Sequence, residues 1–385
     1  MQKKLIRITT IPLSFGLLLE GQMSYMKDFY NVVAVSSEKE HLEEIGEKEG
    51  VSTFVVEMTR KITPLKDLAS LFKLYRFLKR EKPTIVHTHT PKAGLIGMLA
   101  SKLARVPVRL HTVAGLPLLE AKGIKRKILY FVEKLTYNCA TKVYPNSYGL
   151  KAIIEQDKFT TKTKLKVLGN GSSNGIDTEH FSSKSLDKTV LEPLKNKFKI
   201  SKDDFVYIFV GRIVGDKGIN ELVEAFNDIN KDFNNVKLLL IGPFEDDLDP
   251  IKKFTKQVIE LNNNIITTGF QEDVRPYFAI SHVLTFPSYR EGFPNVVMQA
   301  GAIGLPSIVS DINGCNEIIT NGLNGSIVKK KDVAVLKAEM RSYLIDKKKY
   351  KKTKENSRQI IVKKYQRSVI MEALLDEYNK MTTNV

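Results

Sequence analysis

The residues of this chain whose types and spacing could do chemistry gather in its second half. In the stretch FVGRIVGDKGINELVEAF, Arg212 and Lys217 lie in a short loop that follows an apolar run ending at Gly211. A helical pattern begins near Gly218. Arginine offers a planar fork of donors, lysine offers a compact charge, and the first amides of a helix attract anions. We interpret this loop as a receptor for a diphosphate, with two solvated loop cations as the alternative for this pair alone.

The stretch SYREGFPNVVMQAGAIGLP begins with charged residues and continues into an apolar helix. Pro294 has a fixed φ and no N–H, which favours a helix that begins just beyond it. We expect Asn295 to cap this helix. The free amides of Val296 and Val297 would then form another anion site.

The same stretch also offers hydrogen-bond acceptors. Glu291 cannot bind phosphate, because like charges repel, but it can accept hydrogen bonds from the hydroxyls of a neutral polyol. Gln299 can do the same, and Gly292 lets the backbone approach a ligand closely. Phosphate donors beside hydroxyl acceptors predict a site for a sugar nucleotide. The alternative, in which Glu291 pairs with Arg290 on the surface and Gln299 is solvated, does not explain both elements together.

Short β-branched runs alternate with longer helical patterns along the first half of the chain. Such alternation predicts a parallel sheet with helices on both faces. The predicted strands are 5–9, 31–37, 53–58, 84–90, 108–113, 142–147 and 166–170, and the clearest helices are 65–82 and 125–140.

The pattern then restarts, so we predict an α/β protein with two Rossmann-like, doubly wound domains. The boundary lies in the polar segment 170–188, which gives domains over 1–175 and 176–385. The last helix, about 366–381, belongs to the second domain by order but could pack back on the first. Ligands of this architecture bind in a cleft at the carboxyl ends of the strands. The further predicted strands are 204–212, 236–243, 265–270, 282–288, 306–311 and 325–329, with a helix over 218–233.

Composition limits the possible partners. The formal net charge of +17 favours anionic partners, namely nucleic acid, phosphate-bearing small molecules or an anionic membrane. The basic residues form no recognised nucleic-acid module, so nucleic acid is disfavoured. Two cysteines, Cys139 and Cys315, cannot make a disulfide framework. No apolar run reaches the roughly 18 residues that span a bilayer, and we interpret the N-terminus as a buried strand rather than a signal peptide.

Several long motifs occur in the order typical of one family. They are HTHTPKAGLIGMLASKLARVPVRLHTVAGLP, NGSSNGID, GRIVGDKGI, GFQEDVRPYF and SYREGFPNVVMQAGAIGLPSIVSDINGCNEII. Through them the whole chain resembles the family-4 retaining glycosyltransferases of the GT-B fold. The first motif is similar to the bacterial subgroup that extends lipid-linked oligosaccharides for capsules, O-antigens or protein glycosylation.

The resemblance implies roles for matching residues. Arg212 and Lys217 match the pair that binds the donor diphosphate, and Glu291 matches the first Glu of a Glu-x7-Glu motif that contacts the transferred sugar. His111 matches a histidine near the donor sugar, and Gly16 would lie in the loop after the first strand that meets the donor phosphates and the acceptor. The remaining donor-site assignments by resemblance are Gly211, Phe270, Gly292, Phe293, Pro294, Asn295, Val296, Val297 and Gln299.

The chain departs from the family pattern at Gln299, where the second Glu of the motif is expected. That Glu accepts hydrogen bonds from the nucleotide ribose. A neutral acceptor contributes about 0.5–1.5 kcal/mol, against about 1.5–3 kcal/mol for a charged one. We therefore expect weaker ribose binding but an active enzyme.

The implied mechanism needs no cofactor and no metal. Breaking the anomeric C–O bond puts negative charge on the nucleotide diphosphate, which Arg212, Lys217 and the helix-start amides would stabilise. The resemblance implies retention of configuration, with the leaving phosphate taking the acceptor proton. The acidic stretch 245–250 could bind a cation, but a solvated loop is the better interpretation. His87 and His89 lie on one face of a strand and lack a third metal ligand, so packed or substrate-lining histidines are expected.

We predict a hexosyl- or N-acetylhexosaminyltransferase that uses a nucleotide sugar, most plausibly UDP-linked, and a polyprenyl-diphosphate-linked saccharide acceptor. The segments 73–82 and 121–134 mix basic and apolar residues, and we hypothesise that 121–134 docks on the inner face of the cytoplasmic membrane. Two alternatives stay open. One is a UDP-sugar 2-epimerase-like enzyme, and the other is an inactive sugar-nucleotide-binding subunit.

Overall fold

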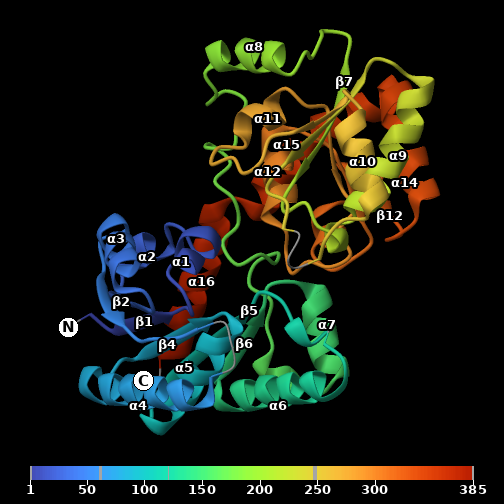
Figure 1. Cartoon of the computed structure of the whole chain (residues 1–385). Helices are drawn as coiled ribbons and strands as arrows, with labels where there is room; N and C mark the ends of the chain where they lie inside the picture. The colour runs from blue at the N-terminus through green and yellow to red at the C-terminus, as the bar shows by residue number, and fades with distance from the viewer. Residues whose placement is uncertain (1, 60–62, 120, 246–248, 384–385) are drawn as a thin grey trace. The chain divides into compact units, whose positions relative to one another are not determined.

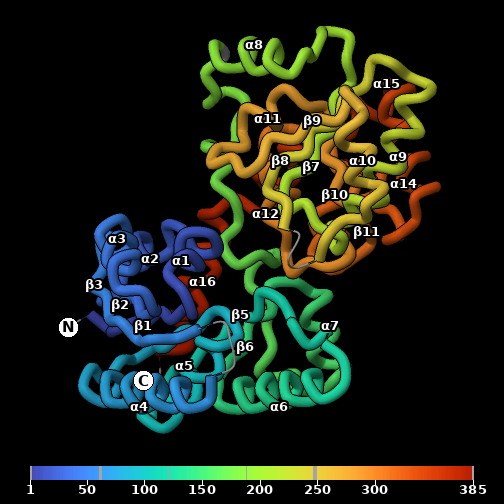
Figure 2. Tube along the Cα trace, viewed as in Figure 1, coloured from blue at the N-terminus to red at the C-terminus, as the bar shows by residue number. Residues whose placement is uncertain are grey.

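The computed structural model describes residues 2–59, 63–119, 121–245 and 249–383. It divides into two compact units (Figures 1 and 2). The first unit comprises residues 1–174 and 368–385, and the second comprises residues 175–367. The chain passes from the first unit to the second inside the polar segment 170–188, and returns at the start of the last helix.

The first unit is built on a parallel sheet of six strands among its described residues. In space the strands follow the order β3-β2-β1-β4-β5-β6. This order places the first strand in the centre and is the usual arrangement of a dinucleotide-binding fold. The strands are β1 (Lys4–Ile8), β2 (Asn31–Ser36), β3 (Ser52–Val55), β4 (Ile85–His89), β5 (Val108–Val113) and β6 (Lys142–Pro145).

Helices cover both faces of this sheet, and each face has its own apolar cluster. One face packs against α1 (Leu13–Leu18), α2 (Gln22–Met26), α3 (Lys39–Glu49) and α16 (Arg367–Thr382). The other face packs against α4 (Pro64–Glu81), α5 (Pro91–Leu103), α6 (Gly123–Cys139) and α7 (Tyr148–Gln156). The short 3₁₀ turns η1 (Pro117–Leu119) and η2 (Lys162–Lys164) connect these elements.

The last helix, α16, lies on the first sheet although it ends the chain. Its Tyr378 is buried and its hydroxyl accepts a hydrogen bond from Arg7 at 3.2 Å. Its Glu377 accepts hydrogen bonds from Tyr144 and Lys166. These buried polar contacts fix the helix in register against β1 and β6.

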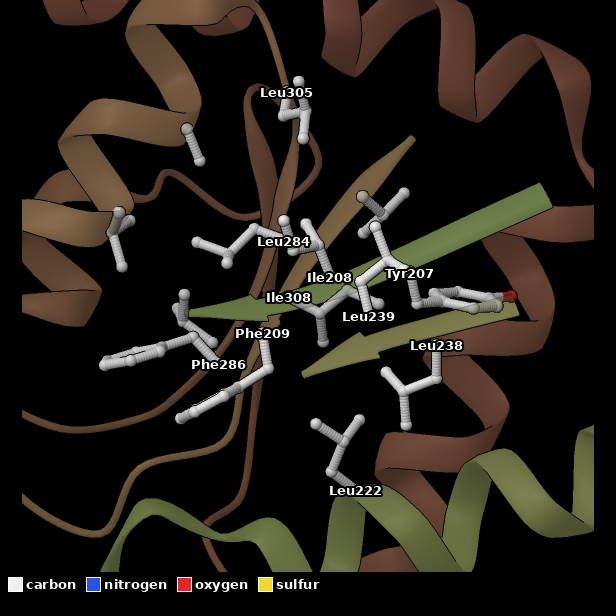
Figure 3. Packing of buried hydrophobic residues seen from close by; sticks show 14 of the residues in the cluster. Tyr207, Ile208, Phe209, Leu222, Leu238, Leu239, Leu284, Phe286, Leu305 and Ile308 are labelled. Atoms are coloured by element: carbon white, nitrogen blue, oxygen red, sulfur yellow. The ribbon is translucent and has the colours of Figure 1, made fainter. Parts of the chain in front are cut away.

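The second unit repeats the same topology, with the spatial order β12-β11-β10-β7-β8-β9. Its strands and helices share one continuous apolar core, part of which Figure 3 shows around Ile208, Phe209 and Leu239. The strands are β7 (Phe205–Val210), β8 (Val236–Ile241), β9 (Ile265–Thr267), β10 (Val283–Phe286), β11 (Ser307–Ser310) and β12 (Gly325–Val328). The helices are α8 (Lys188–Lys197), α9 (Ile219–Asp232), α10 (Lys253–Leu261), α11 (Arg275–Ala279), α12 (Asn295–Ile303), α13 (Cys315–Ile318), α14 (Val333–Ile345) and α15 (Lys347–Tyr365), with the 3₁₀ turn η3 (Gly215–Lys217).

Every predicted strand is present except the run 166–170, for which the prediction is wrong. In that region only Leu165 forms a bridge, to Val143 of β6. The chain then turns at Gly169 and Gly171, both of which have positive φ. An apolar run followed by two glycines in left-handed conformations cannot extend a strand.

Among the described residues, no helix has both the length and the apolar composition needed to cross a bilayer.

Candidate active site

The loop after β7 has the geometry that its glycines require. Gly218 caps α9 with a φ of 72°, and a Cβ added there would lie 2.2 Å from the carbonyl oxygen of Pro287. Only glycine fits both the conformation and this close approach. The loop is therefore pressed against the end of β10, and Lys217 is brought beside the stretch that begins at Ser288.

Lys217 and Glu291 form an ion pair within this junction. Their side chains are only 15% and 16% exposed. The same carboxylate oxygen of Glu291 accepts a hydrogen bond from the Ser288 hydroxyl at 2.9 Å. Lys217 also lies 5.9 Å from the centre of the Phe286 ring. The structure thus brings together the predicted phosphate-binding cation and the predicted hydroxyl-binding carboxylate.

Arg212 lies in the same electrostatic environment. Its guanidinium donates to Glu245 at 2.8 Å, and this hydrogen bond is the main cause of a raised pKa for Arg212. The negative charges of Asp216 and Glu291 also raise the pKa of Arg212. The residue stays charged and partly exposed, as a diphosphate ligand would require.

The described residues of the acidic stretch 245–250 make contacts with other residues of the protein. Glu245 pairs with Arg212, and Asp249 accepts the backbone N–H of Asp216 at 2.6 Å. Residues 246–248 of this stretch lie outside the described residues. In the parts of the chain that the structure describes, no three acidic, His or Cys side chains are grouped so that they could hold a metal.

The helix after the second stretch begins where Pro294 predicts, but its first turn differs in two details. Pro294 is itself the N-cap and Asn295 is the first helical residue, so the prediction that Asn295 caps the helix is wrong. The amide of Val297 donates to the carbonyl of Pro294 at 3.2 Å, so it is not free for an anion. The amide of Val296 stays in the first turn, where a helix offers no acceptor of its own.

The turn before α12 is fixed from outside by the segment before α13. The side chain of Asn313 donates to the backbone carbonyls of Glu291 and Gly292. Gly314 has a φ of 76°, and a Cβ there would lie 2.3 Å from the carbonyl oxygen of Gly292. Because Asn313 and Gly314 hold this turn in place, the side chain of Glu291 has a fixed direction.

The other predicted donor-site residues of this unit differ in accessibility. Gln299 lies one turn inside α12, and its side chain makes no hydrogen bond to any described residue. Phe270 follows β9 and is 75% exposed, so its ring is available for stacking. Phe293 is buried against Tyr365, with ring centres 5.4 Å apart, so its side chain is part of the core rather than of a ligand site. Gly211 ends β7 with a φ of 149°, directly beside Gly242.

The two site residues predicted in the first unit are not placed as expected. His111 is 3% exposed, its Nδ1 lies 2.8 Å from the Thr88 hydroxyl, and burial lowers its pKa to about 4. Gly94 of α5 covers its ring, so the structure does not support a contact between His111 and a donor sugar. Gly16 lies within helix α1 and not in a loop, which corrects the predicted position.

Sequence reasoning missed several residues that shape this site. Ser288 and Asn313 position Glu291, and Asp216 accepts an ion pair from Arg290 at 2.6 Å. Ser288 is the first residue of the motif SYREGFPNVVMQAGAIGLP, and the structure shows that this polar residue is completely buried. Asn313 lies in the same motif but 22 residues from Glu291, so only the fold reveals their contact.

Known protein families match both units. The model of the glycosyl transferases group 1 family matches residues 192–360, and the glycosyl transferase 4-like domain matches residues 25–171. The capsular polysaccharide biosynthesis glycosyltransferase CapM of Staphylococcus aureus is 35% identical over 378 residues, which cover 98% of this chain and 97% of CapM. The UDP-Gal:alpha-D-GlcNAc-diphosphoundecaprenol alpha-1,3-galactosyltransferase of Escherichia coli is 31% identical over 73% of this chain and 71% of that enzyme.

Solved structures share the fold over the whole chain. Anabaena Alr3699/HepE, solved in complex with UDP and glucose, has a TM-score of 0.81 at 17% identity and covers 98% of this chain and 100% of its own. A glycosyltransferase from Rickettsia africae has a TM-score of 0.80 at 20% identity, with full coverage of both chains. The two Rossmann-like sheets are thus those of a GT-B protein, which confirms the predicted fold class.

This fold and these relatives define a class, the glycosyltransferases of the GT-B architecture. Within that class the chain belongs to the glycosyl transferases of group 1, with a glycosyl transferase 4-like first domain. It is a glycosyltransferase.

Proposed function

We propose that the protein transfers a hexose or N-acetylhexosamine from a UDP-sugar to a polyprenyl-diphosphate-linked saccharide during surface polysaccharide synthesis. The carrying observation is the contact between Lys217 and Glu291, which sets a phosphate-binding cation beside a hydroxyl acceptor. The similar enzymes are named for capsular polysaccharide biosynthesis and for galactosyl transfer to a diphosphoundecaprenol-linked sugar, which supports this choice of substrates.

In this proposal the second unit binds the donor. Arg212 and Lys217 bind the diphosphate, and the first-turn amide of Val296 adds a donor to the distal phosphate. Glu291 accepts hydrogen bonds from the transferred sugar, and Gln299 accepts them from the ribose. The exposed ring of Phe270 stacks on the base.

The chemistry follows from where charge develops. As the anomeric C–O bond breaks, its electron pair adds one negative charge to the leaving diphosphate, and fixed cations stabilise this charge more in the transition state than in the ground state. The leaving phosphate takes the proton of the acceptor hydroxyl on the same face, which gives retention. No protein nucleophile, cofactor or metal is assigned in this mechanism.

The ion pair between Lys217 and Glu291 is part of the proposal. A bound diphosphate competes with Glu291 for Lys217. Once the lysine turns to phosphate, the carboxylate is released to accept hydrogen bonds from the sugar. Donor binding therefore converts an internal pair into two ligand contacts.

The first unit would meet the membrane with the outer side of its α4–α5–α6 layer, along which α4 and α6 both run (Figure 1). We define the basic-apolar face as the outward residues of this layer. Its exposed apolar side chains include Leu65, Leu68, Phe72, Leu103, Ile124, Ile128 and Phe131. Lys125, Arg126 and Lys127 lie between them on α6, which is the composition of a helix that rests on an anionic bilayer. In this proposal the enzyme rests on the inner face of the cytoplasmic membrane, where its acceptor is anchored.

The test is a donor and acceptor screen with the purified full chain. UDP release is measured for a panel of UDP-sugars, with and without polyprenyl-diphosphate-linked saccharides extracted from bacteria. Transfer from one UDP-sugar, with the anomeric configuration of the product retained by NMR, is the expected result. Epimerised UDP-sugar in the absence of acceptor, or no turnover with any donor, contradicts the proposal.

A further inference from the structure

An apolar groove lies on the outer side of the first unit, between α4 and α5, which pack side by side (Figure 1). It offers about 250 Å³ of free volume. A cavity of about 150 Å³ is enough to bind a ligand of the size of benzene, so this groove has room for a larger apolar group. We call it the α4 groove, and its lining residues are Leu68, Leu71, Phe72, Tyr75 and Leu103.

Helix α4 has two apolar stripes, of which only the inner one is fully buried. Leu74 and Leu78 of the inner stripe belong to the core of the first unit. The α4 residues of the groove form the outer stripe, and their spacing of i, i+3, i+4 and i+7 puts them on one face of the helix. Leu68 and Phe72 of this stripe are 63% and 58% exposed, and Leu103 of α5 is 58% exposed. Contiguous exposed apolar surface of this kind is typical of an interaction site.

The rim of the α4 groove is basic. The guanidinium carbon of Arg76 lies 5.6 Å from the centre of the Phe72 ring. The two acidic side chains of the helix, Asp67 and Glu81, form ion pairs of 2.7 Å and 2.6 Å with lysines outside it. An occupant of the groove therefore meets an excess of positive charge. The other charged side chains of α4 are basic and exposed, namely Lys66, Lys73, Arg76, Lys79 and Arg80.

Charge decides among the occupants that an apolar groove can take. A second copy of the chain is disfavoured, because a twofold interface sets each basic rim against its own like charges. An anionic lipid satisfies both parts of the site, since its alkyl chain fills the groove and its headgroup meets the cations. The stretch of α4 from Leu68 to Tyr75 is about 10 Å long, which suits one extended alkyl chain.

The α4 groove is also continuous with the basic-apolar face. Leu68, Phe72 and Leu103 belong to both. A chain that enters the groove can therefore come from a bilayer in contact with that face.

We propose that the α4 groove binds one acyl chain of an anionic phospholipid, with Arg76 beside the headgroup phosphate. The proposal rests on the proposed function for the membrane that supplies this lipid. It adds a pocket for a single chain to a face that would otherwise only rest on the bilayer. Anchoring through this pocket does not depend on the basic residues of α6.

The test measures binding of monomeric alkyl phosphates to the full chain by isothermal titration calorimetry. Hexyl, octyl and decyl phosphate are used below their micelle concentrations, so that neither a bilayer nor a micelle is present. We expect one molecule to bind per chain, with an affinity that rises about fourfold for each methylene group that enters the groove. Arg76→Gln should weaken the binding of decyl phosphate about fivefold, and should leave the binding of the neutral decyl maltoside unchanged.

A variant that fills the groove separates a pocket from a flat apolar surface. Leu103→Trp keeps the surface apolar but occupies the groove, and it should weaken the binding of decyl phosphate by about tenfold or more. Leu68→Ser removes apolar lining and should do the same. The matched control is Leu261→Ser on α10 of the second unit, because Leu261 is 82% exposed and does not line the groove. All three side chains are exposed, so each variant should keep the Tm of wild type.

Four results would overturn the inference. Two are a wild type that does not bind decyl phosphate and a Leu103→Trp variant that binds it undiminished. Tighter binding of farnesyl phosphate than of decyl phosphate would assign the groove to the isoprenoid chain of the acceptor. A dimer that Leu68→Ser dissociates would assign it to a second copy of the chain.

Liposome flotation and UDP release by the same samples keep the proposals distinguishable. Flotation that depends on Lys125, Arg126 and Lys127 would support the membrane proposal even if decyl phosphate does not bind. Chain binding by a protein that transfers no sugar would support the groove and count against the proposed function.

Discussion

At the scale of single residues, the proposed mechanism depends on competition for one ammonium group. Lys217 and Glu291 neutralise each other in a partly desolvated setting, where an ion pair is stronger than on the open surface. A diphosphate with two negative charges can displace one carboxylate. The residues that position this pair, Ser288 and Asn313, touch Glu291 and not Lys217, so the carboxylate stays in place when the lysine moves.

Removing either donor-site cation should mainly slow the chemical step. Lys217→Ala and Arg212→Ala are each expected to lower kcat/KM about 10²–10³-fold, the range found when one group that stabilises developing negative charge is removed. Arg341→Ala is the matched control, because Arg341 is half exposed and pairs with Asp232, outside the assigned site. Steady-state kinetics of UDP release provide the measurement. Equal losses for all three variants would show that the effect is general charge and not the assigned site.

Restoring the acidic residue at position 299 should tighten donor binding. Gln299→Glu replaces a neutral acceptor by a charged one, which is worth about 1 kcal/mol for a hydroxyl donor. The KM for the UDP-sugar is expected to fall about fivefold with little change in kcat. Gln299→Ala should raise it. Activity that appears only in the Glu variant, from an inactive wild type, would instead favour a sugar-nucleotide-binding subunit.

At the scale of elements, the sequence predicts where helices start better than how their first turns are bonded. Pro294 fixes the start of α12, because its φ and missing N–H act locally. The identity of the N-cap depends on a shift of one residue that no residue type determines, which is why Asn295 lies inside the helix. The family resemblance predicts Gly16 in a loop, but a single glycine is tolerated within the short helix α1.

The close packing of η3, α9 and β10 requires a glycine at position 218, and this requirement can be tested. Gly218→Ala places a Cβ on a residue with a φ of 72° and brings it against the Pro287 carbonyl. Gly322→Ala places a Cβ on a residue with a φ of 73° but with open space around it. The control should cost about 1–2 kcal/mol of unfolding free energy, the usual penalty of a left-handed conformation. Gly218→Ala should cost more and also weaken UDP binding, as measured by denaturant unfolding and calorimetry. Equal costs would show that the close approach adds nothing.

Helix α6 is the element on which the membrane proposal depends. Lys125, Arg126 and Lys127 changed together to Glu should abolish flotation of the protein with anionic liposomes, because each basic residue near such a surface contributes about 1 kcal/mol. The same change of net charge on α15, with Lys347, Lys348 and Lys352 changed to Glu, is the control. Unaltered flotation of the α6 variant would remove this helix from the proposal.

At the scale of the whole molecule, the alternation of strands and helices was enough to predict both sheets and their boundary region. Two features depend on packing and lie beyond such patterns. The position of His111 in the alternating pattern of β5 is compatible with a site residue. Its side chain lies on the face of the sheet that α5 covers, so His111 is a core residue. His89 lies on the opposite face, with its nitrogens unused. A single sequence cannot tell which face of a central strand a helix will cover.

The stability of the whole chain should depend on pH through Glu133 of α6. Burial raises the pKa of this carboxyl to about 7, above the value near 4.5 that it has when exposed. The folded state therefore binds the proton more tightly than the unfolded state, and the stability that this provides is complete below about pH 4.5 and is lost as pH rises to about 7. The loss is at most about 3 kcal/mol. Glu133→Gln should remove it, so that the variant gains stability over wild type at pH 8 but not at pH 4.5, as measured by Tm across this range. The exposed Glu44→Gln serves as the control, and parallel pH profiles for wild type and Glu133→Gln would contradict the assignment.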